Sequence, residues 1–161
     1  MTADFISEKI YELPAITQKV SQWKNERKKI VFTNGVFDLL HKGHIFSLSQ
    51  AAKQGDVLII GVNSDKSVKK LKGDNRPIND QDARVLLLAS LFMVDAVVIF
   101  EEDTPLNLIT SLLPDVLVKG GDYTIDEIAG AKEVIANGGK IVINPILDGF
   151  STTAIIKAIS K

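Results

Sequence analysis

Five short apolar runs, separated by stretches with helical spacing, constrain the fold of this chain more than any other feature. Strands are predicted at Ile30–Phe32, Val57–Val62, Asp95–Phe100, Val116–Val118 and Lys140–Ile143. Helices are predicted between and after them, at Gly43–Gln54, Lys66–Leu71, Asp80–Met93, Leu106–Leu113, Ile125–Asn137 and Ser151–Ser160. Strands that alternate with helices form right-handed βαβ units and a parallel sheet. We therefore predict an α/β fold with a Rossmann-like, doubly wound sheet of five parallel strands.

The first 27 residues have a different pattern. Apolar side chains recur there at spacings of three and four, at Ile6, Ile10, Leu13, Ile16, Val20 and Trp23. This spacing predicts one or two helices, broken near Pro14, that lie against the main body or pair with a second subunit. We expect a helical extension over residues 1–27 and one domain over residues 28–161.

Composition excludes several classes of partner. The hydrophobic content of 45% is enough for a core, and the net charge of −1 gives no basic field for nucleic acid. The chain has no cysteine, so disulfides and thiolate chemistry are excluded. No run approaches the ~18 apolar residues that span a bilayer, and the N-terminus lacks the apolar core of a signal peptide. We expect a cytoplasmic protein without a membrane partner.

The turn after the first strand carries the strongest chemical signal, because ligands of open parallel sheets bind at the carboxyl ends of the strands. The turn contains two glycines and two histidines, in the sequence Thr33-Asn34-Gly35-Val36-Phe37-Asp38-Leu39-Leu40-His41-Lys42-Gly43-His44. A helix N-terminus attracts phosphate, glycine allows close approach of the backbone, and imidazoles donate hydrogen bonds. The alternatives are an inert polar turn or a zinc half-site, which would need Asp or Glu ligands.

Three further clusters are predicted at the same edge of the sheet. Asn63 and Asp65 follow the second strand and precede four cations, which are Lys69, Lys70, Lys72 and Arg76. These cations either fold over a polyphosphate or form a solvated basic loop. The fourth strand ends in Lys119-Gly120-Gly121-Asp122-Tyr123, and the last helix begins with Ser151-Thr152-Thr153. Three hydroxyls at a helix N-terminus favour an anion pocket. Arg84, inside a predicted helix, either reaches this site or forms a surface pair.

Other nucleotide and hydrolase motifs are absent. The chain has no Walker sequence, no dinucleotide fingerprint after the first strand, and no serine nucleophile elbow. Hydride transfer and acyl hydrolysis therefore have no support.

Two of these segments resemble the signatures of one family. Residues 35–44 resemble the HxGH signature of the cytidylyltransferase-like nucleotidyltransferases, and Phe150-Ser151-Thr152-Thr153 resembles the second signature of that family. The stretch Lys119–Tyr123 is most similar to the members that make ADP-heptose for lipopolysaccharide. The resemblance covers about residues 28–160. Two positions depart from it: Val36 stands where cysteine is common, and Ala158 where a basic residue is common.

The resemblance implies that a sugar-phosphate oxygen attacks the α-phosphorus of a nucleoside triphosphate and that pyrophosphate leaves. We assign His41 and His44 to the α-phosphate oxygens, and Lys72 to the leaving phosphates or the incoming phosphate. Nucleotide-binding positions are Thr33, Asn34, Gly35, Phe37, Asp38, Gly43, Lys119, Gly120, Asp122, Ser151, Thr152 and Thr153. Substrate-binding positions are Asn63, Asp65, Lys69, Arg76 and Arg84.

The same resemblance implies the substrates and partners. ATP and D-glycero-β-D-manno-heptose 1-phosphate are the expected substrates, with CTP and glycerol 3-phosphate as the alternative pair. A catalytically silent nucleotide-binding module is a second alternative. Mg²⁺ is expected through phosphate oxygens, and no residue is assigned as a metal ligand. We also expect a homodimer. A separate heptose kinase is expected as well, because residues 1–27 are too few for a kinase domain.

Overall fold

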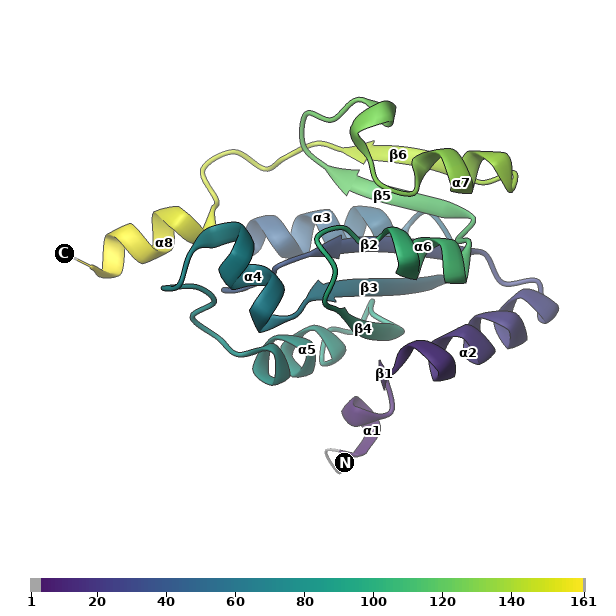
Figure 1. Ribbon diagram of the computed structural model, residues 1–161, viewed down its shortest axis with the longest axis horizontal. Coiled ribbons are helices and arrows are strands. Elements are labelled where there is room, and N and C mark those ends of the chain that lie inside the picture. Colours follow the sequence, from purple (N-terminus) through teal and green to yellow (C-terminus); the bar gives the residue numbers. More distant parts are fainter. Residues whose placement is uncertain (1–3, 161) are drawn as a thin grey trace.

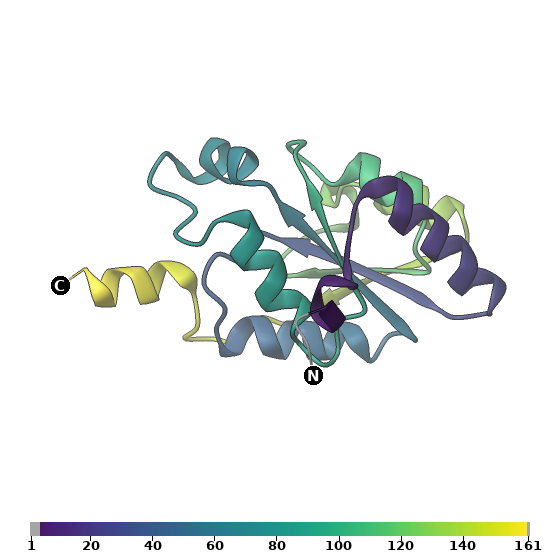
Figure 2. The ribbon, with the colours of Figure 1, turned by 90° about the horizontal axis from the view of Figure 1, so that it is seen from below.

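The computed structural model describes residues 4–160 as one parallel sheet between two layers of helices (Figures 1 and 2). The sheet has six strands in the order β1-β4-β3-β2-β5-β6. Their bounds are β1 Ile10–Tyr11, β2 Ile30–Gly35, β3 Val57–Asn63, β4 Ala96–Phe100, β5 Val116–Gly120 and β6 Lys140–Asn144. From β2 the chain builds outward through β3 and β4, then returns to add β5 and β6 on the other side. The order therefore reverses between β2 and β5, where such sheets bind ligands.

Helices cover both faces of the sheet. Their bounds are α1 Asp4–Ser7, α2 Leu13–Asn25, α3 Lys42–Ala52, α4 Asp65–Lys72, α5 Gln81–Ala89, α6 Leu106–Leu112, α7 Ala131–Ala136 and α8 Thr152–Ile159. A 3₁₀ turn, η1, spans Ile125–Glu127. Apolar side chains of α2, α6 and α7 pack on one face, and those of α3 and α5 pack on the other. Within residues 4–160, no helix has the length and apolar character needed to cross a membrane.

The sheet has a hydrophobic core on each face, and this explains why its strands are continuous apolar runs in the sequence. Along β2, Ile30 and Phe32 join the core under α2 and α6, while Val31 joins the core under α3 and α5. All three are completely buried. A strand buried on both faces is a continuous apolar run rather than an alternating one. The α/β class and the parallel doubly wound sheet are thus confirmed.

The predicted count of five strands is wrong, because a sixth strand lies in the predicted N-terminal helical stripe. Ile10 and Tyr11 form β1, an edge strand parallel to β4, in register with Val97 and Val98. Without β1, the backbone N–H and C=O groups along the outer edge of β4 would lack partners within the sheet. The hydrogen bonds that β1 provides outweigh the preference of these two residues for a helix. Pro14 lies in the first turn of α2, where its missing N–H costs nothing, and does not break a helix. Below it, α2 buries Ile16, Val20 and Trp23 in the core.

Two predicted helices are shorter than expected. The helix predicted to reach Met93 ends as α5 at Ala89. The helix predicted over 125–137 is divided into η1 and α7 by Gly130, which has a φ of 82°. A Cβ at position 130 would lie 2.6 Å from the Ile109 side chain. Glycine is therefore needed both for the positive φ of this turn and for the close packing of the turn against α6.

Candidate active site

The two histidines are held in place by the turn between β2 and α3. His41 is the N-cap of α3, and its Nδ1 accepts a hydrogen bond from the Gly43 N–H at 3.1 Å. Its ring stacks on the His44 ring with the centroids 3.8 Å apart and the planes inclined by 23°. The edge of Phe37 contacts His44 with a centroid distance of 5.2 Å. A Cβ on Gly35 would lie 2.9 Å from the Phe37 ring, so this packing requires glycine at position 35.

Both imidazoles are neutral at pH 7. Burial, with a smaller contribution from His41, lowers the pKa of His44 to about 4, although a backbone hydrogen bond at Leu39 opposes the shift. Burial also lowers the pKa of His41. Because Nδ1 of neutral His41 accepts a hydrogen bond, its proton is on Nε2, which is therefore a donor. Within residues 4–160, the buried Nδ1 of His44 has no hydrogen-bond partner. The pair thus has a polar atom that the described residues leave without a partner.

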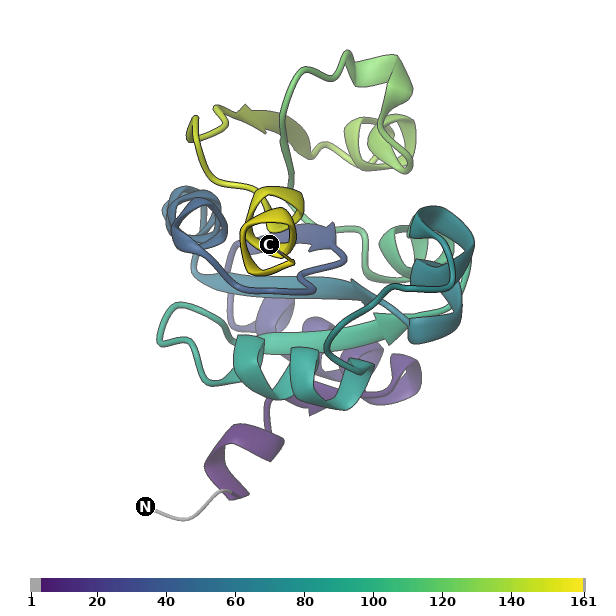
Figure 3. The same cartoon turned by 90° about the vertical axis from the view of Figure 1, so that its left-hand side faces the viewer.

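A cavity of about 420 Å³ lies beside the histidines at the carboxyl edge of the sheet. Figure 3 looks onto this edge, with α8 seen end-on in front of the strands. The cavity joins segments far apart in the sequence, and the predicted site residues that line it are Phe37, Asp38, His41, Gly43, His44, Lys72, Arg76, Gly120, Ser151, Thr152 and Thr153. The Thr152 hydroxyl donates to the Leu39 carbonyl at 3.5 Å, and the Ser151 hydroxyl caps α8 by accepting from the Ala154 N–H. We call this space the histidine cavity.

A second cavity of about 400 Å³ lies next to the histidine cavity, with Val36 and Lys72 lining both. The predicted residues that line it are Asn34, Gly35, Asn63, Lys72 and Lys119. Tyr123, Phe100, Thr104 and η1 complete its wall. We call it the lysine cavity. The predicted nucleotide-binding residues are therefore divided between two spaces.

Asp38, one of the predicted nucleotide-binding residues, lines the histidine cavity, but its carboxylate is engaged within the protein. Its carboxylate is buried, forms an ion pair with Arg76, and accepts hydrogen bonds from the N–H groups of Ile78 and Asn79. Burial alone would raise the pKa of Asp38, but these N–H groups and Arg76 outweigh it and lower the pKa. Asp38 and Arg76 therefore fix the 73–79 loop against the histidine turn.

Arg84 likewise serves the protein's own structure. It is completely buried, and its guanidinium donates to the carbonyls of Val36, Asn63 and Asn79 and to the Asp65 carboxylate. Asn63 donates from its side chain to Ser67. Arg84 thus holds the ends of β2 and β3 together, and its ion pair with Asp65 engages that carboxylate within the protein.

Besides Asp65 and Arg84, three predicted site residues lie outside both cavities. Thr33 is buried within β2, Lys69 is exposed on α4, and Asp122 lines a separate pocket with Ile143 and Pro145. Conversely, the structure adds Ser47, which the sequence did not single out, to the wall of the histidine cavity, one turn after His44 on α3. Phe150, which precedes the predicted Ser151–Thr153 segment, also lines this cavity, and the Lys42 ammonium lies 5.4 Å from the centroid of its ring. The i, i+3 spacing from His44 was the available signal for Ser47.

The described residues offer few ligands to a metal ion. Within residues 4–160, no three His, Asp or Glu side chains gather as a metal site. Asp38 alone supplies a carboxylate among the described lining of the histidine cavity, and it is already engaged with Arg76. Protein-held zinc therefore does not fit this turn. Mg²⁺ fits only if phosphate oxygens and water supply its ligands, which is its usual mode of binding.

Comparison with known proteins agrees with this geometry. Residues 32–158 match the family described as Cytidylyltransferase-like. The match covers most of the chain, so the protein belongs to the cytidylyltransferase-like nucleotidyltransferase family.

Several relatives are similar over much of the chain. The Bifunctional protein HldE of Cronobacter sakazakii is 54% identical over 91% of this chain, and that of Shigella flexneri is 56% identical over 88%. The chain spans only 31% and 30% of the length of these two relatives.

Two solved structures are also similar. A lipopolysaccharide core biosynthesis protein from Thermoplasma volcanium aligns with a TM-score of 0.59 and 29% identity, over 74% of this chain and 97% of that one. Pantoate-beta-alanine ligase from Francisella tularensis aligns with a TM-score of 0.56 and 17% identity, over 94% of this chain and 76% of that one, and shows likeness of fold alone.

Proposed function

We propose that this chain transfers the AMP group of ATP to D-glycero-β-D-manno-heptose 1-phosphate and releases pyrophosphate. One observation carries the proposal: a single cavity is lined by the stacked histidine pair and by the hydroxyl-bearing N-terminus of α8. Donors on both sides of one space suit a triphosphate. The 54% identity to HldE of Cronobacter sakazakii supports the sugar substrate, since the motifs that the chain shares with ADP-heptose-forming enzymes lie in the matched region.

The proposed reaction needs no covalent enzyme intermediate. An oxygen of the sugar phosphate forms a bond to the α-phosphorus of ATP, and the bond from that phosphorus to the bridging oxygen of pyrophosphate breaks. The nucleophile is already an anion, so no strong general base is required. Catalysis then consists of in-line positioning and stabilisation of charge on the phosphoryl oxygens.

Each side of the histidine cavity has a defined part in this mechanism. His41 and His44 donate to oxygens of the α-phosphate as their charge grows. The α8 N-terminus holds the β- and γ-phosphates through free N–H groups and the hydroxyls of Thr152 and Thr153. Lys72, which borders both cavities, neutralises charge between the two substrates. We propose that Mg²⁺ is bound by the phosphate oxygens of ATP.

We also propose that the chain forms a homodimer and that a separate heptose kinase supplies the sugar phosphate. Exposed apolar side chains on α5 and in the turn after it, Leu86, Leu87 and Phe92, support a second copy as the partner. The HldE relatives are named bifunctional and are matched over only 31% and 30% of their length, which supports a partner activity in the same reaction sequence that the matched region does not itself supply. A mass measurement in solution tests the dimer: twice the chain mass is expected, and a monomer at all concentrations would contradict it.

A substrate panel tests the function. Purified protein is incubated with ATP, CTP or GTP and with heptose 1-phosphate or glycerol 3-phosphate, and pyrophosphate release is measured. ATP with heptose 1-phosphate should give the highest kcat/KM, and His44→Ala should abolish turnover with an unchanged circular dichroism spectrum. Preference for CTP and glycerol 3-phosphate would replace the proposed substrates. Nucleotide binding without turnover of any pair would show a non-catalytic module.

A further inference from the structure

The end of β5 contributes to both cavities through consecutive residues. Side chains alternate between the two faces of a strand. Leu117 belongs to the core under α6, and Val118 to the core under α3. Lys119 continues the first face and lines the lysine cavity, whereas Gly120 continues the second and lines the histidine cavity. The two cavities thus open on opposite faces of the sheet, separated by the end of β2.

The ammonium of Lys119 has an unusual environment for a cation. Within residues 4–160 it forms no hydrogen bond or ion pair, and its contact is with the ring of Tyr123, 5.3 Å from Nζ to the centroid. The side chain is partly buried, and burial lowers the pKa of Lys119 from its usual value. An incompletely solvated cation without a counter-charge favours a bound anion.

The carboxylates of the lysine cavity do not supply that counter-charge. Asp103 is paired with Lys70 at 2.6 Å, and Glu127 accepts hydrogen bonds from the backbone N–H and the hydroxyl of Thr124. The remaining wall combines polar groups of Asn34 and Thr104 with the rings of Phe100 and Tyr123. Hydrogen-bonding groups, apolar surface and, among the described residues, two lysines without a hydrogen-bonding or ionic partner, Lys119 and Lys72, together suit a polyhydroxylated molecule that carries a phosphate.

We propose that Lys119 binds the phosphate of the acceptor sugar, which enters through the lysine cavity on the face of the sheet opposite the nucleotide. This inference rests on the proposed function and adds the placement of the second substrate. In-line displacement requires the nucleophile and the leaving group on opposite sides of the phosphorus. With pyrophosphate at α8 in the histidine cavity, an acceptor in the lysine cavity approaches past Gly35 and Val36 from the other side. Lys119 is therefore a specificity-determining residue for a phosphorylated acceptor.

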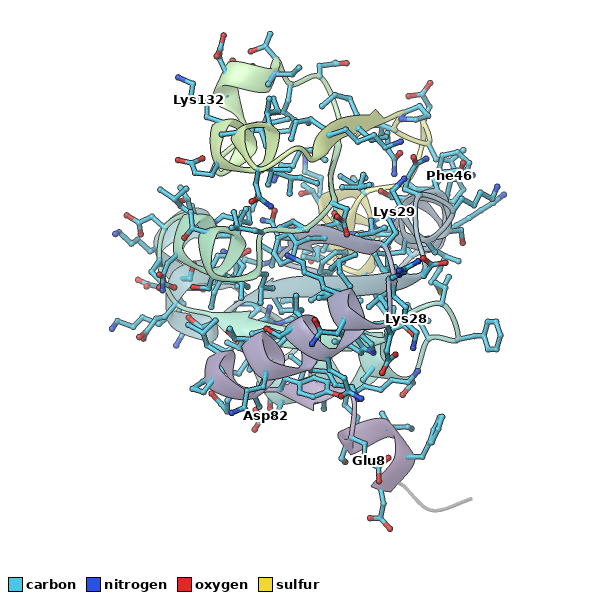
Figure 4. All side chains as sticks on the ribbon, turned by 90° about the vertical axis from the view of Figure 1, so that its right-hand side faces the viewer. Glu8, Lys28, Lys29, Phe46, Asp82 and Lys132 are labelled. Carbon is cyan, nitrogen blue, oxygen red and sulfur yellow. The ribbon has the colours of Figure 1, made fainter. Side chains whose placement is uncertain are left out.

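Steady-state kinetics of Lys119→Met and Lys119→Arg test this placement, with Lys132→Met as the control. Lys132 is exposed on α7 (Figure 4) and lines neither cavity. Lys119→Met should raise the KM for heptose 1-phosphate by about 10- to 100-fold, the range for loss of one charge-assisted hydrogen bond. The KM for ATP should stay within about twofold, and Lys119→Arg should recover part of the loss. A raised KM for ATP with an unchanged KM for the sugar phosphate would overturn the proposal.

A binding measurement separates this inference from the proposed function. Calorimetric titration of heptose 1-phosphate into protein saturated with α,β-methylene-ATP reports acceptor binding without turnover. We expect binding to wild type and Lys132→Met and at least tenfold weaker binding to Lys119→Met. Equal affinities, or no binding to wild type, would overturn the role of Lys119. If the affinities differ as expected but no nucleotide is turned over, the proposed function fails while the lysine subsite stands.

Discussion

The two sides of the histidine cavity differ in how firmly the protein holds them. On the β2–α3 side, the Asp38–Arg76 pair is largely buried, His41 is anchored to the Gly43 N–H, and the two imidazoles stack. On the α8 side, no residue of the helix is buried and the helix extends away from the body (Figure 1). The Thr152 hydroxyl, in its first turn, is hydrogen-bonded to the Leu39 carbonyl. The histidines are thus preorganised, while a triphosphate would itself complete the attachment of α8. Short helices without packing are marginal in water.

The largest expected effect is on the firm side. Asp38→Ala leaves the Arg76 guanidinium and two backbone N–H groups without their partner in a buried place, which costs about 3–5 kcal/mol of unfolding free energy. Urea denaturation measures this loss. Asp103→Ala is the matched control, because its ion pair with Lys70 is exposed and contributes at most about 1 kcal/mol. Equal losses in the two variants would contradict the strong anchoring of the β2–α3 side by the Asp38–Arg76 pair.

His41→Asn tests catalysis on the firm side without removing the helix cap. Asparagine is a good N-cap, so the unfolding free energy should change by no more than about 0.5 kcal/mol. The variant lacks the imidazole Nε2–H, and kcat should fall by roughly 10²–10³, the usual loss for one donor to a developing charge. Pyrophosphate release measures kcat. A variant with wild-type kcat would show that His41 only caps α3.

A smaller effect is expected on the pH dependence of stability. The pKa of folded His44 is about 4, below its ordinary value of 6.5, so between these values the unfolded chain binds more protons. The unfolding free energy should therefore rise with pH across that window and fall on acidification. Urea denaturation from pH 7 to pH 4 measures it, with His44→Gln as the non-titrating control. Identical pH dependence in both proteins would contradict the depressed pKa.

The smallest effect is expected on the loose side. Thr152→Val removes one hydroxyl from the α8 N-terminus, together with its hydrogen bond to the Leu39 carbonyl. The loss of one hydrogen bond to the triphosphate costs about 1 kcal/mol, which is roughly fivefold in affinity for ATP. The loss should be in the KM for ATP, with little change in unfolding free energy because α8 is not packed. Thr110→Val, at a half-buried position on α6 outside both cavities, is the control. A large loss of stability would show that α8 is held as firmly as the histidines.

The sequence was sufficient for the sheet and for the convergence of the motifs. Apolar runs such as Val57–Val62 mark strands buried on both faces, and a parallel sheet places the residues after each strand at one edge. The shared position of the histidines and the Ser151–Thr153 segment follows from that topology. The edge strand β1 could not be predicted, because two residues have no period and their conformation depends on the free edge of β4.

Which charged residues pair with each other inside the protein, and which face a cavity, could not be predicted either. Asp38 and Arg76 are 38 positions apart, and only the folded loop shows that they neutralise each other. Arg84 lies in an apolar helix, and its role depends on carbonyl groups at the ends of β2 and β3. Lys119 and Gly120 are neighbours in sequence, yet the strand sends them to different cavities. Such roles depend on long-range contacts that local pattern does not contain.

Hydrogen exchange of the backbone amides, with and without α,β-methylene-ATP, tests most directly whether one triphosphate joins the two sides of the histidine cavity. The account predicts slower exchange at the N-terminal turn of α3 and, with a larger change, along α8, because the nucleotide orders the loosely held helix. Protection at α3 alone, with α8 exchanging at its ligand-free rate while the nucleotide is bound, would contradict it.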